Sequence, residues 1–313
     1  MGETKIEWTA TFAADGSVLT KGYTFNAWWG CAKVSEACAS CYAEGFAKRL
    51  GKGDLWRGRR ERTSAKNWSH LLHWNRQARD AGQLRQVFAF SMADVLEDLG
   101  QELDTWRGEF FELAEQCTSL RFLLLTKRPE NGLRMFPRRW LGPVDRPWWE
   151  PSPTWPRNVW VGTTVETQGN DTRIGHLLQI PTPVPFLSIE PLLGPLDLDR
   201  VTRWADGHGP FGASALSGGS WGHFRRLAPE TADYCNHSNA PKVRWVIVGT
   251  ESGPRRRPTN PDWIRKLRDQ CVDARVPFFL KQADLGDGRG LVHLPELDGR
   301  RWTEQPFALH TGR

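Results

Sequence analysis

Three cysteines lie close together near the N-terminus, in the stretch GCAKVSEACASCYAE at residues 30–44. They are Cys31, Cys38 and Cys41, with the spacing C-x6-C-x2-C. Cysteine thiolates bind zinc and hold iron–sulfur clusters, and a structural zinc site usually has four protein ligands. Disulfides use cysteines in pairs. Three cysteines therefore predict a metal site in which one coordination position is left open.

Two other interpretations of the three cysteines stay open. A zinc site with three cysteines and one histidine needs a histidine at ligand spacing, but the next histidine along the chain is His70. The thiols could also carry no metal. Six cysteines in 313 residues are too few for a disulfide framework, which favours a reducing, cytoplasmic environment.

Short apolar runs alternate with longer amphipathic stretches along the chain. Near-continuous apolar runs are typical of strands that are buried on both faces of a parallel sheet. Such runs lie at residues 23–29, 86–91, 121–126, 158–165, 184–190, 244–251 and 276–282. Helical patterns lie between them, and the apolar face of the one over 261–275 includes Cys271. The alternation predicts an α/β fold, a partial or complete (β/α) barrel of about six or seven parallel strands.

We expect a single elaborated barrel domain over residues 1–313, because one (β/α) barrel commonly has about this length. Two connections are too long for simple crossovers and are expected to be insertions, at 129–157 and 199–242. The turn sequence ADGS predicts an added hairpin over residues 10–22.

Polar side chains follow each predicted strand at the point where the strand ends. In a parallel barrel these ends share one rim, where active sites are built. A single charge after a strand is usually a solvated loop residue, but here the pattern repeats: Ser91 and Asp94, Lys127 and Arg128, Glu166, Glu190, Glu251 and Ser252, Lys281 and Gln282. We therefore expect a polar pocket facing the cysteines, with Lys127, Glu251 and Lys281 as candidate catalytic residues.

The chain as a whole resembles a family of phage and prophage proteins with a three-Cys motif and no assigned function. The resemblance rests on TKIEWT at 4–9, WGCAKVSEACASCYAE at 29–44, LLTKRPE at 124–130, NVWVGTTVE at 158–166, FLSIEPLLGPLDL at 186–198, WVIVGTESGP at 245–254 and PDWIRKLRDQC…VPFFLKQ at 261–282. The three-Cys loop after the first strand of a barrel also resembles the radical S-adenosylmethionine superfamily. There, three cysteines hold a [4Fe–4S] cluster whose open iron binds S-adenosylmethionine, and reductive cleavage of that cofactor yields a deoxyadenosyl radical.

The second resemblance implies roles for several residues. Cys31, Cys38 and Cys41 would be the ligands of a [4Fe–4S] cluster. The segment from Ser91 to Asp94 would meet the amino group of S-adenosylmethionine, while Glu166 and Glu190 would contact its ribose or the substrate. The common superfamily loop has a first gap of three residues and an aromatic before the last cysteine. Here the gap is six residues and the aromatic, Tyr42, follows Cys41, where we expect it beside the cofactor.

The charge and aromatic content bear on the partner. The net charge is +6 with a pI near 9.1, and basic residues gather at 56–79, 134–140 and 255–257. Six of the 17 tryptophans interleave with these arginines: Trp56, Trp68, Trp74, Trp140, Trp148 and Trp149. Such interleaving suits base stacking, but large aromatics also pack beneath an arginine-rich surface. The pattern favours a nucleic acid or nucleotide partner.

These observations together predict an enzyme that uses an iron–sulfur cluster and S-adenosylmethionine to modify or repair a nucleic-acid base or nucleotide. Two alternatives stay open: a radical enzyme acting on a small molecule or peptide, and a non-catalytic nucleic-acid-binding protein with a structural metal site. No apolar run approaches the roughly 20 residues of a membrane span, so we expect no membrane partner. The sequence contains no Walker-type G-x4-G-K-[ST], no H-E-x-x-H and no G-x-S-x-G.

Overall fold

The structure is a computed structural model that describes residues 2–13, 16–143, 145, 152–205, 208–218, 220–221, 241–253 and 256–306. The chain divides into two compact units. The first comprises Met1–Thr164 with Ile180–Pro183, and the second comprises Val165–Gln179 with Val184–Arg313. The prediction of one elaborated domain stays a prediction.

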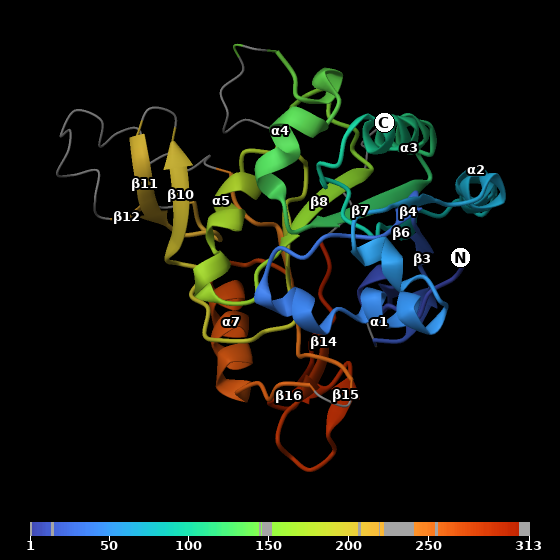
Figure 1. Cartoon of the computed structure of the whole chain (residues 1–313). Coiled ribbons are helices and arrows are strands. Elements are labelled where there is room, and N and C mark those ends of the chain that lie inside the picture. Colours follow the sequence, from blue (N-terminus) through green and yellow to red (C-terminus); the bar gives the residue numbers. More distant parts are fainter. Residues whose placement is uncertain are drawn as a thin grey trace. The chain divides into compact units, whose positions relative to one another are not determined.

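Four parallel strands form the sheet of the first unit, in the order β3, β6, β7, β8 (Figure 1). They are β3 (Tyr23–Phe25), β6 (Arg85–Ala89), β7 (Leu120–Thr126) and β8 (Val159–Thr164). Every residue of β8 is buried, as expected for a parallel strand covered on both faces. The apolar runs at 86–91, 121–126 and 158–165 therefore predicted these strands correctly.

The first unit also contains four helices, each with some buried residues. They are α1 (Tyr42–Arg49), α2 (Ala65–Asp80), α3 (Gln101–Gln116) and the short α4 (Gly132–Met135). Helix α2 begins after Ser64, whose hydroxyl accepts a hydrogen bond from the backbone N–H of Asn67, a standard N-cap. Its buried face includes Trp68, Leu71 and Trp74.

Short elements complete the first unit. The 3-10 turns are η1 (Glu7–Thr9), η2 (Glu36–Ser40), η3 (Gly53–Trp56), η4 (Pro129–Asn131) and η5 (Arg138–Trp140). Two antiparallel pairs join β1 (Thr11–Phe12) to β2 (Val18–Thr20) and β4 (Trp28–Trp29) to β5 (Glu61–Arg62). The β1–β2 pair confirms the hairpin predicted over residues 10–22. In the predicted insertion at 129–157, residues 144 and 146–151 lie outside the described part of the chain.

The second unit has three parallel strands in the order β9, β13, β14, with β15 antiparallel on β14. Their bounds are β9 (Phe186–Ile189), β13 (Trp245–Gly249), β14 (Phe278–Asp284) and β15 (Leu291–His293). Its helical elements are η6 (Gln168–Asn170), α5 (Thr172–Leu177) and α7 (Pro261–Asp273). Helix α7 starts with Pro261 after the N-cap Asn260, and it buries Cys271 as predicted, whereas Val272 is exposed.

Two further groups of strands belong to the second unit. The predicted insertion at 199–242 contains an antiparallel group of β10 (Val201–Ala205), β11 (His208–Ala213) and β12 (Ser220–Trp221). Residues 206–207, 219 and 222–240 of this segment lie outside the described part of the chain. A small hairpin pairs β16 (Glu296–Leu297) with β17 (Arg300–Arg301).

The predicted fold class is confirmed at the level of a mixed α/β fold whose principal strands are mostly parallel, an arrangement compatible with a partial barrel. None of the described helices is both long and apolar enough to cross a bilayer.

Candidate functional site

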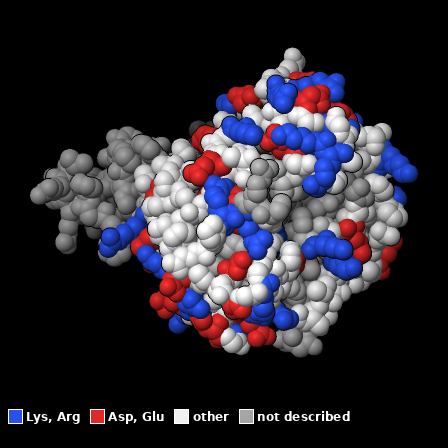
Figure 2. Space-filling view, turned by 60° about the horizontal axis from the view of Figure 1, so that its bottom comes forward, with Lys and Arg blue, Asp and Glu red and all other residues white. Residues whose placement is uncertain are grey.

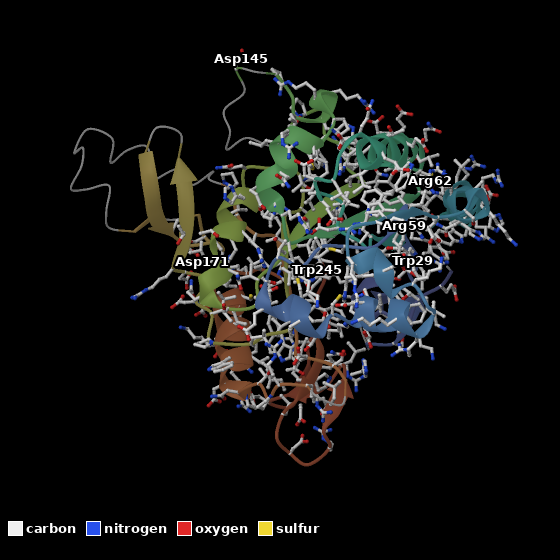
Figure 3. All side chains as sticks on the ribbon, in the orientation of Figure 1. Trp29, Arg59, Arg62, Asp145, Asp171 and Trp245 are labelled. Atoms are coloured by element: carbon white, nitrogen blue, oxygen red, sulfur yellow. The ribbon has the colours of Figure 1, made fainter. Side chains whose placement is uncertain are left out.

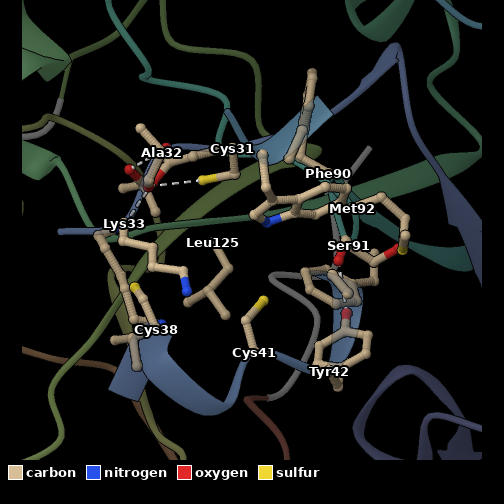
Figure 4. Close-up of a pocket in the computed structure, with 18 residues that line it drawn as sticks. Cys31, Ala32, Lys33, Cys38, Cys41, Tyr42, Phe90, Ser91, Met92 and Leu125 are labelled. Atoms are coloured by element: carbon tan, nitrogen blue, oxygen red, sulfur yellow. Dashed lines mark hydrogen bonds between the residues drawn. The ribbon is translucent and has the colours of Figure 1, made fainter. Parts of the chain in front are cut away.

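The three cysteines line one cavity within the first unit (Figure 4). The cavity has a volume of about 140 Å³, roughly ten times the 10–15 Å³ that one water molecule needs by the same measure. The aromatic side chains Trp56, Phe88 and Phe90 and the polar residues Ser91, Asp94 and Lys127 line it together with Tyr42. The space is large enough for a group of several heavy atoms.

A tight turn at the end of β4 positions Cys31. The chain leaves β4 through Gly30, which adopts a φ of 110°, a conformation that favours glycine. A Cβ at this position would lie 2.4 Å from the backbone oxygen of Leu55 and 2.8 Å from Cδ of Arg60. Glycine is therefore required where the chain turns into the cysteine loop.

Asn26, at the end of β3, ties the first strand to the end of β6. Its side-chain oxygen accepts a hydrogen bond of 2.7 Å from the backbone N–H of Met92, and its amide donates to the hydroxyl of Ser91 at 3.0 Å. The neighbouring Phe90 adopts a φ of 66°, which is rare for a bulky side chain and is found mostly where local structure enforces it. These contacts hold Ser91 at the cavity.

A buried network of charges holds the residue that follows Cys31. The backbone N–H of Ala32 donates to Oε1 of Glu97 at 2.7 Å, and Nη2 of Arg128 donates to the carbonyl oxygen of Ala32 at 2.9 Å. Glu97 also accepts two hydrogen bonds from Arg60, at 2.6 and 2.7 Å, and both of these side chains are 2 % exposed. The cysteine loop is thus anchored by charge-assisted hydrogen bonds on both sides of its backbone.

Burial and charge affect the thiols differently. Burial, with the nearby carboxylates of Asp94 and Glu97, raises the pKa of Cys31 to about 12, although Arg128 opposes the shift. Burial also disfavours the Cys38 thiolate. Hydrogen bonds from Val34 and Ser35 and the charge of Lys127 outweigh this effect, so the pKa of Cys38 lies below its ordinary value.

Asp94 lines the cavity, but its carboxylate already accepts several hydrogen bonds. Oδ1 accepts from the hydroxyl of Thr126 at 2.6 Å, and Oδ2 accepts from the backbone N–H of Lys127 at 2.9 Å and from Arg128 at 2.9 Å. Asp94 therefore fixes the end of β7 beside the cysteine loop. The role in cofactor binding that we expected for it stays a prediction.

Tyr42 stands at the start of α1 and lines the same cavity. Its hydroxyl donates a hydrogen bond of 2.6 Å to the backbone oxygen of Ser91, and its ring is 59 % exposed. Seven predicted site residues therefore lie around one cavity: Cys31, Cys38, Cys41, Tyr42, Ser91, Asp94 and Lys127.

The other four predicted residues belong to the second unit, and each carboxylate there has a basic partner. Glu190 pairs with Lys281. Glu166 is 1 % exposed and accepts a hydrogen bond of 2.8 Å from Arg173. A Cβ at Gly249 would lie 3.2 Å from Cδ of Glu190, so the glycine leaves room for this carboxylate.

The remaining residue of the four, Glu251, is bound by Arg257, six residues later in the chain. It accepts hydrogen bonds from the backbone N–H and the guanidinium of Arg257, at 2.8, 3.0 and 2.7 Å. The hydrogen bonds from Arg173 and Arg257 therefore satisfy the buried carboxylates of Glu166 and Glu251. The predicted roles of Glu166, Glu190, Glu251 and Lys281 in catalysis or cofactor binding stay predictions.

The kind of metal site that the three cysteines form stays a prediction. Among the residues that the structure describes, no three His, Cys, Asp or Glu side chains are gathered closely enough to hold a metal ion. No histidine is among the described residues that line the cavity. In a [4Fe–4S] cluster the thiolates bind different irons, so the ligands stand farther apart. Three free thiols around one cavity suit such a cluster chemically.

A protein-family model described as a protein of unknown function, DUF5131, matches residues 3–306. The chain belongs to this family. No curated protein and no solved structure matches it. The DUF5131 match agrees with the predicted membership of a family without an assigned function, and it covers both units of the chain.

Most of the interleaved tryptophans of this DUF5131 chain are core residues. Trp56, Trp68, Trp74 and Trp140 are all less than 9 % exposed, so packing accounts for them. Trp148 and Trp149 lie outside the described residues. The exposed aromatic side chains near the cysteines are instead Tyr42 and Phe46, on α1.

Two of the four arginines of residues 57–62, Arg60 and Arg62, are committed to structure. Arg60 is buried against Glu97, and Arg62 pairs with Glu109 and lies 4.2 Å from the centre of the Trp68 ring. Arg57 and Arg59 are exposed, and Figure 3 places Arg59 and Arg62 on the side of the ribbon that carries α2. Figure 2 shows basic side chains interspersed with acidic ones on the face in view.

Proposed function

We propose that this protein is a radical S-adenosylmethionine-type iron–sulfur enzyme that modifies or repairs a nucleic-acid base or nucleotide. The observation that carries the proposal is that three free thiols line one cavity at the carboxyl ends of parallel strands. Polar side chains from the ends of β6 and β7 line the same space, as expected where a parallel α/β fold builds an active site. A radical-SAM-like partial or complete barrel is part of the proposal.

Cys31, Cys38 and Cys41 would hold a [4Fe–4S] cluster, and the fourth iron would bind S-adenosylmethionine. When bound, the pair supplies a deoxyadenosyl radical that abstracts hydrogen from the substrate. Arg128 donates to the Cys31 sulfur at 3.7 Å, and Lys127 favours the Cys38 thiolate. These cations offset the negative charge that three ligand thiolates bring to the cavity. Trp56, Phe88 and Phe90 give the cavity apolar walls.

Residues that line the cavity beside the cysteines would bind the organic cofactor. The hydroxyl of Ser91 accepts from Asn26 and retains a proton to donate, and the Tyr42 ring stands at the edge of the cavity. Glu166 and Glu190 would contact the ribose or the substrate, and Lys127, Glu251 and Lys281 are the proposed catalytic side chains. A cytoplasmic location fits the five described cysteines, all of which are free thiols.

A radical enzyme acting on a small molecule or peptide is the second candidate function. The mixture of basic and acidic side chains in Figure 2 favours it, since a polynucleotide substrate usually calls for a more continuous basic surface. A nucleic-acid-binding protein with a structural metal site is the non-catalytic alternative.

Anaerobic reconstitution with iron and sulfide tests the metal assignment. We expect a broad visible absorption shoulder, about four irons and four sulfides per chain, and loss of this absorption in Cys38→Ala. Cys117→Ala is the matched control, because Cys117 is buried and is not among the cavity-lining residues. A featureless spectrum with one zinc per chain would contradict the proposal.

A further inference from the structure

Helix α1 exposes an apolar stripe directly after the last cysteine. Tyr42, Phe46 and Leu50 are 59 %, 41 % and 52 % exposed. Their spacing of four residues places them on one helical face. The small residues Ala43 and Ala47 occupy the buried face instead. A helix normally buries its large apolar side chains, so the exposure of this stripe is unusual.

Cations alternate with aromatic rings along this surface. The Arg49 guanidinium lies 5.7 Å from the centre of the Phe46 ring, and the Lys52 ammonium lies 5.5 Å from that of Trp29. The Phe46 and Trp29 rings are themselves 6.1 Å apart. Residues 31–62 contain eight Lys and Arg and four Asp and Glu, a net charge of +4 against +6 for the whole chain. Two of these cations are neutralised from outside the segment, since Arg60 is buried against Glu97 and Arg62 pairs with Glu109, so the excess of positive charge around α1 is smaller, about +2 (+4 less these two).

Tyr42 belongs both to the stripe and to the cavity. Its hydroxyl is fixed on the backbone oxygen of Ser91 at 2.6 Å, and the side chain lines the cavity that the cysteines share. Figure 4 shows Tyr42 next to Cys41 at the edge of this space. A molecule lying along α1 would therefore reach the cavity without leaving the surface of the first unit.

We propose that α1 is a docking surface for single-stranded nucleic acid, which deepens the substrate assignment of the proposed function and rests on it. Unpaired bases stack on Phe46 and Tyr42, and Arg49 neutralises a neighbouring phosphate, while Lys52 is paired with Glu61. Alternating rings and cations match the alternation of bases and phosphates in a single strand. In a duplex the bases are already stacked on each other, so an enzyme that acts on a base needs it unstacked. The strand places one base at the cavity beside Tyr42.

Fluorescence anisotropy of a labelled twelve-nucleotide single strand, titrated with the metal-free full chain, tests the proposal. We expect Phe46→Ala and Tyr42→Ala each to weaken binding about 5- to 150-fold, the range for loss of one stacked base. Tyr42→Phe retains the ring and should retain most of the affinity. Leu72→Ala is the matched control, because Leu72 is 40 % exposed on α2 of the same unit.

Arg49→Gln and two competitors complete the test. Arg49→Gln should reduce the slope of log K against log salt by about 0.7, the value for one phosphate of a single strand. Unchanged affinity in Phe46→Ala would overturn the proposal, and so would a duplex that binds as tightly as the single strand. Equal competition by polyglutamate, charge for charge, would indicate an acidic protein partner instead and would also overturn it.

The binding assay is independent of the cluster, so the two proposals can fail separately. Oligonucleotide binding that follows the α1 variants, in a protein that assembles no cluster, would overturn the proposed enzyme only. Cluster assembly and cofactor cleavage without binding of any oligonucleotide would overturn the docking surface only.

Discussion

The Arg128 guanidinium bridges the sulfur of Cys31, at 3.7 Å, and a carboxylate oxygen of Asp94, at 2.9 Å. The same side chain also donates to the carbonyl of Ala32, which follows Cys31. One arginine therefore connects the end of β7 with the cysteine loop and places a hydrogen-bond donor beside one of the three thiols. Hydrogen bonds to ligand sulfurs are among the factors that set cluster potentials.

Loss of Arg128 should loosen the cysteine loop. Arg128→Gln leaves Asp94 and Glu97 with one fewer buried cation, so we expect the free energy of unfolding to fall by about 3 kcal/mol or more. Arg128→Lys keeps the positive charge but loses the forked geometry of the guanidinium. It should therefore lower the free energy of unfolding by less than Arg128→Gln does. Hydrogen exchange of peptides covering residues 30–37 should rise more than exchange elsewhere in the first unit.

Arg134→Gln serves as the control for the Arg128 variants. Arg134 pairs with Asp98, but both side chains are more than half exposed, and such pairs contribute at most about 1 kcal/mol. If Arg134→Gln destabilised the protein as much as Arg128→Gln, or if exchange at residues 30–37 were unaffected, the anchoring role of Arg128 would be wrong.

Two glycines should respond in opposite ways to alanine. Gly30→Ala places a Cβ 2.4 Å from a backbone oxygen at a positive φ, so we expect a loss of more than about 2 kcal/mol in the free energy of unfolding. Gly45, within α1, has no atom within 4 Å of an added Cβ. Gly45→Ala should therefore stabilise the protein by about 0.5 to 1 kcal/mol. Urea unfolding of both variants measures the contrast, and equal effects would contradict it.

The thiols of the metal-free protein should react with iodoacetamide in a fixed order. A lowered pKa means more thiolate at a given pH, so Cys38 should be alkylated faster than a free cysteine near pH 7.5. The pKa of Cys31 is raised to about 12, so its alkylation should stay slow until the pH is strongly alkaline. Peptide mass spectrometry between pH 6.5 and 9.5, at about half-unit steps, follows each site.

Lys127→Met checks the cause of the Cys38 reactivity. Removal of the nearby positive charge should raise the pKa of Cys38 and shift its alkylation profile to higher pH. A profile in which Cys31 reacts first, or in which Lys127→Met has no effect on Cys38, would contradict the electrostatics of the cavity.

The sequence predicted much of the frame around the cavity. Strands β6, β7 and β8 were predictable because buried parallel strands have continuous apolar runs. The meeting of Cys31, Ser91 and Lys127 followed from the rule that parallel strands end at one edge. These inferences depend only on local pattern and on strand order.

The anchoring network was not predictable from the sequence. Glu97 and Arg60 are far apart along the chain, and charged residues in such segments are usually solvated. The sequence left packing and base stacking both open for the tryptophans interleaved with arginine, and the four of them that the structure describes are core residues. The stacking surface that we propose depends on Phe46, whose exposure no local pattern revealed.

The central claim is that the three cysteines hold a cluster that cleaves S-adenosylmethionine. The most direct measurement is the formation of 5′-deoxyadenosine from S-adenosylmethionine by the reconstituted, reduced protein, followed by chromatography. We predict that 5′-deoxyadenosine forms with the wild-type chain and with Cys117→Ala, and that none forms with Cys38→Ala. Absence of 5′-deoxyadenosine from a wild-type sample with a full complement of iron and sulfide would contradict the claim.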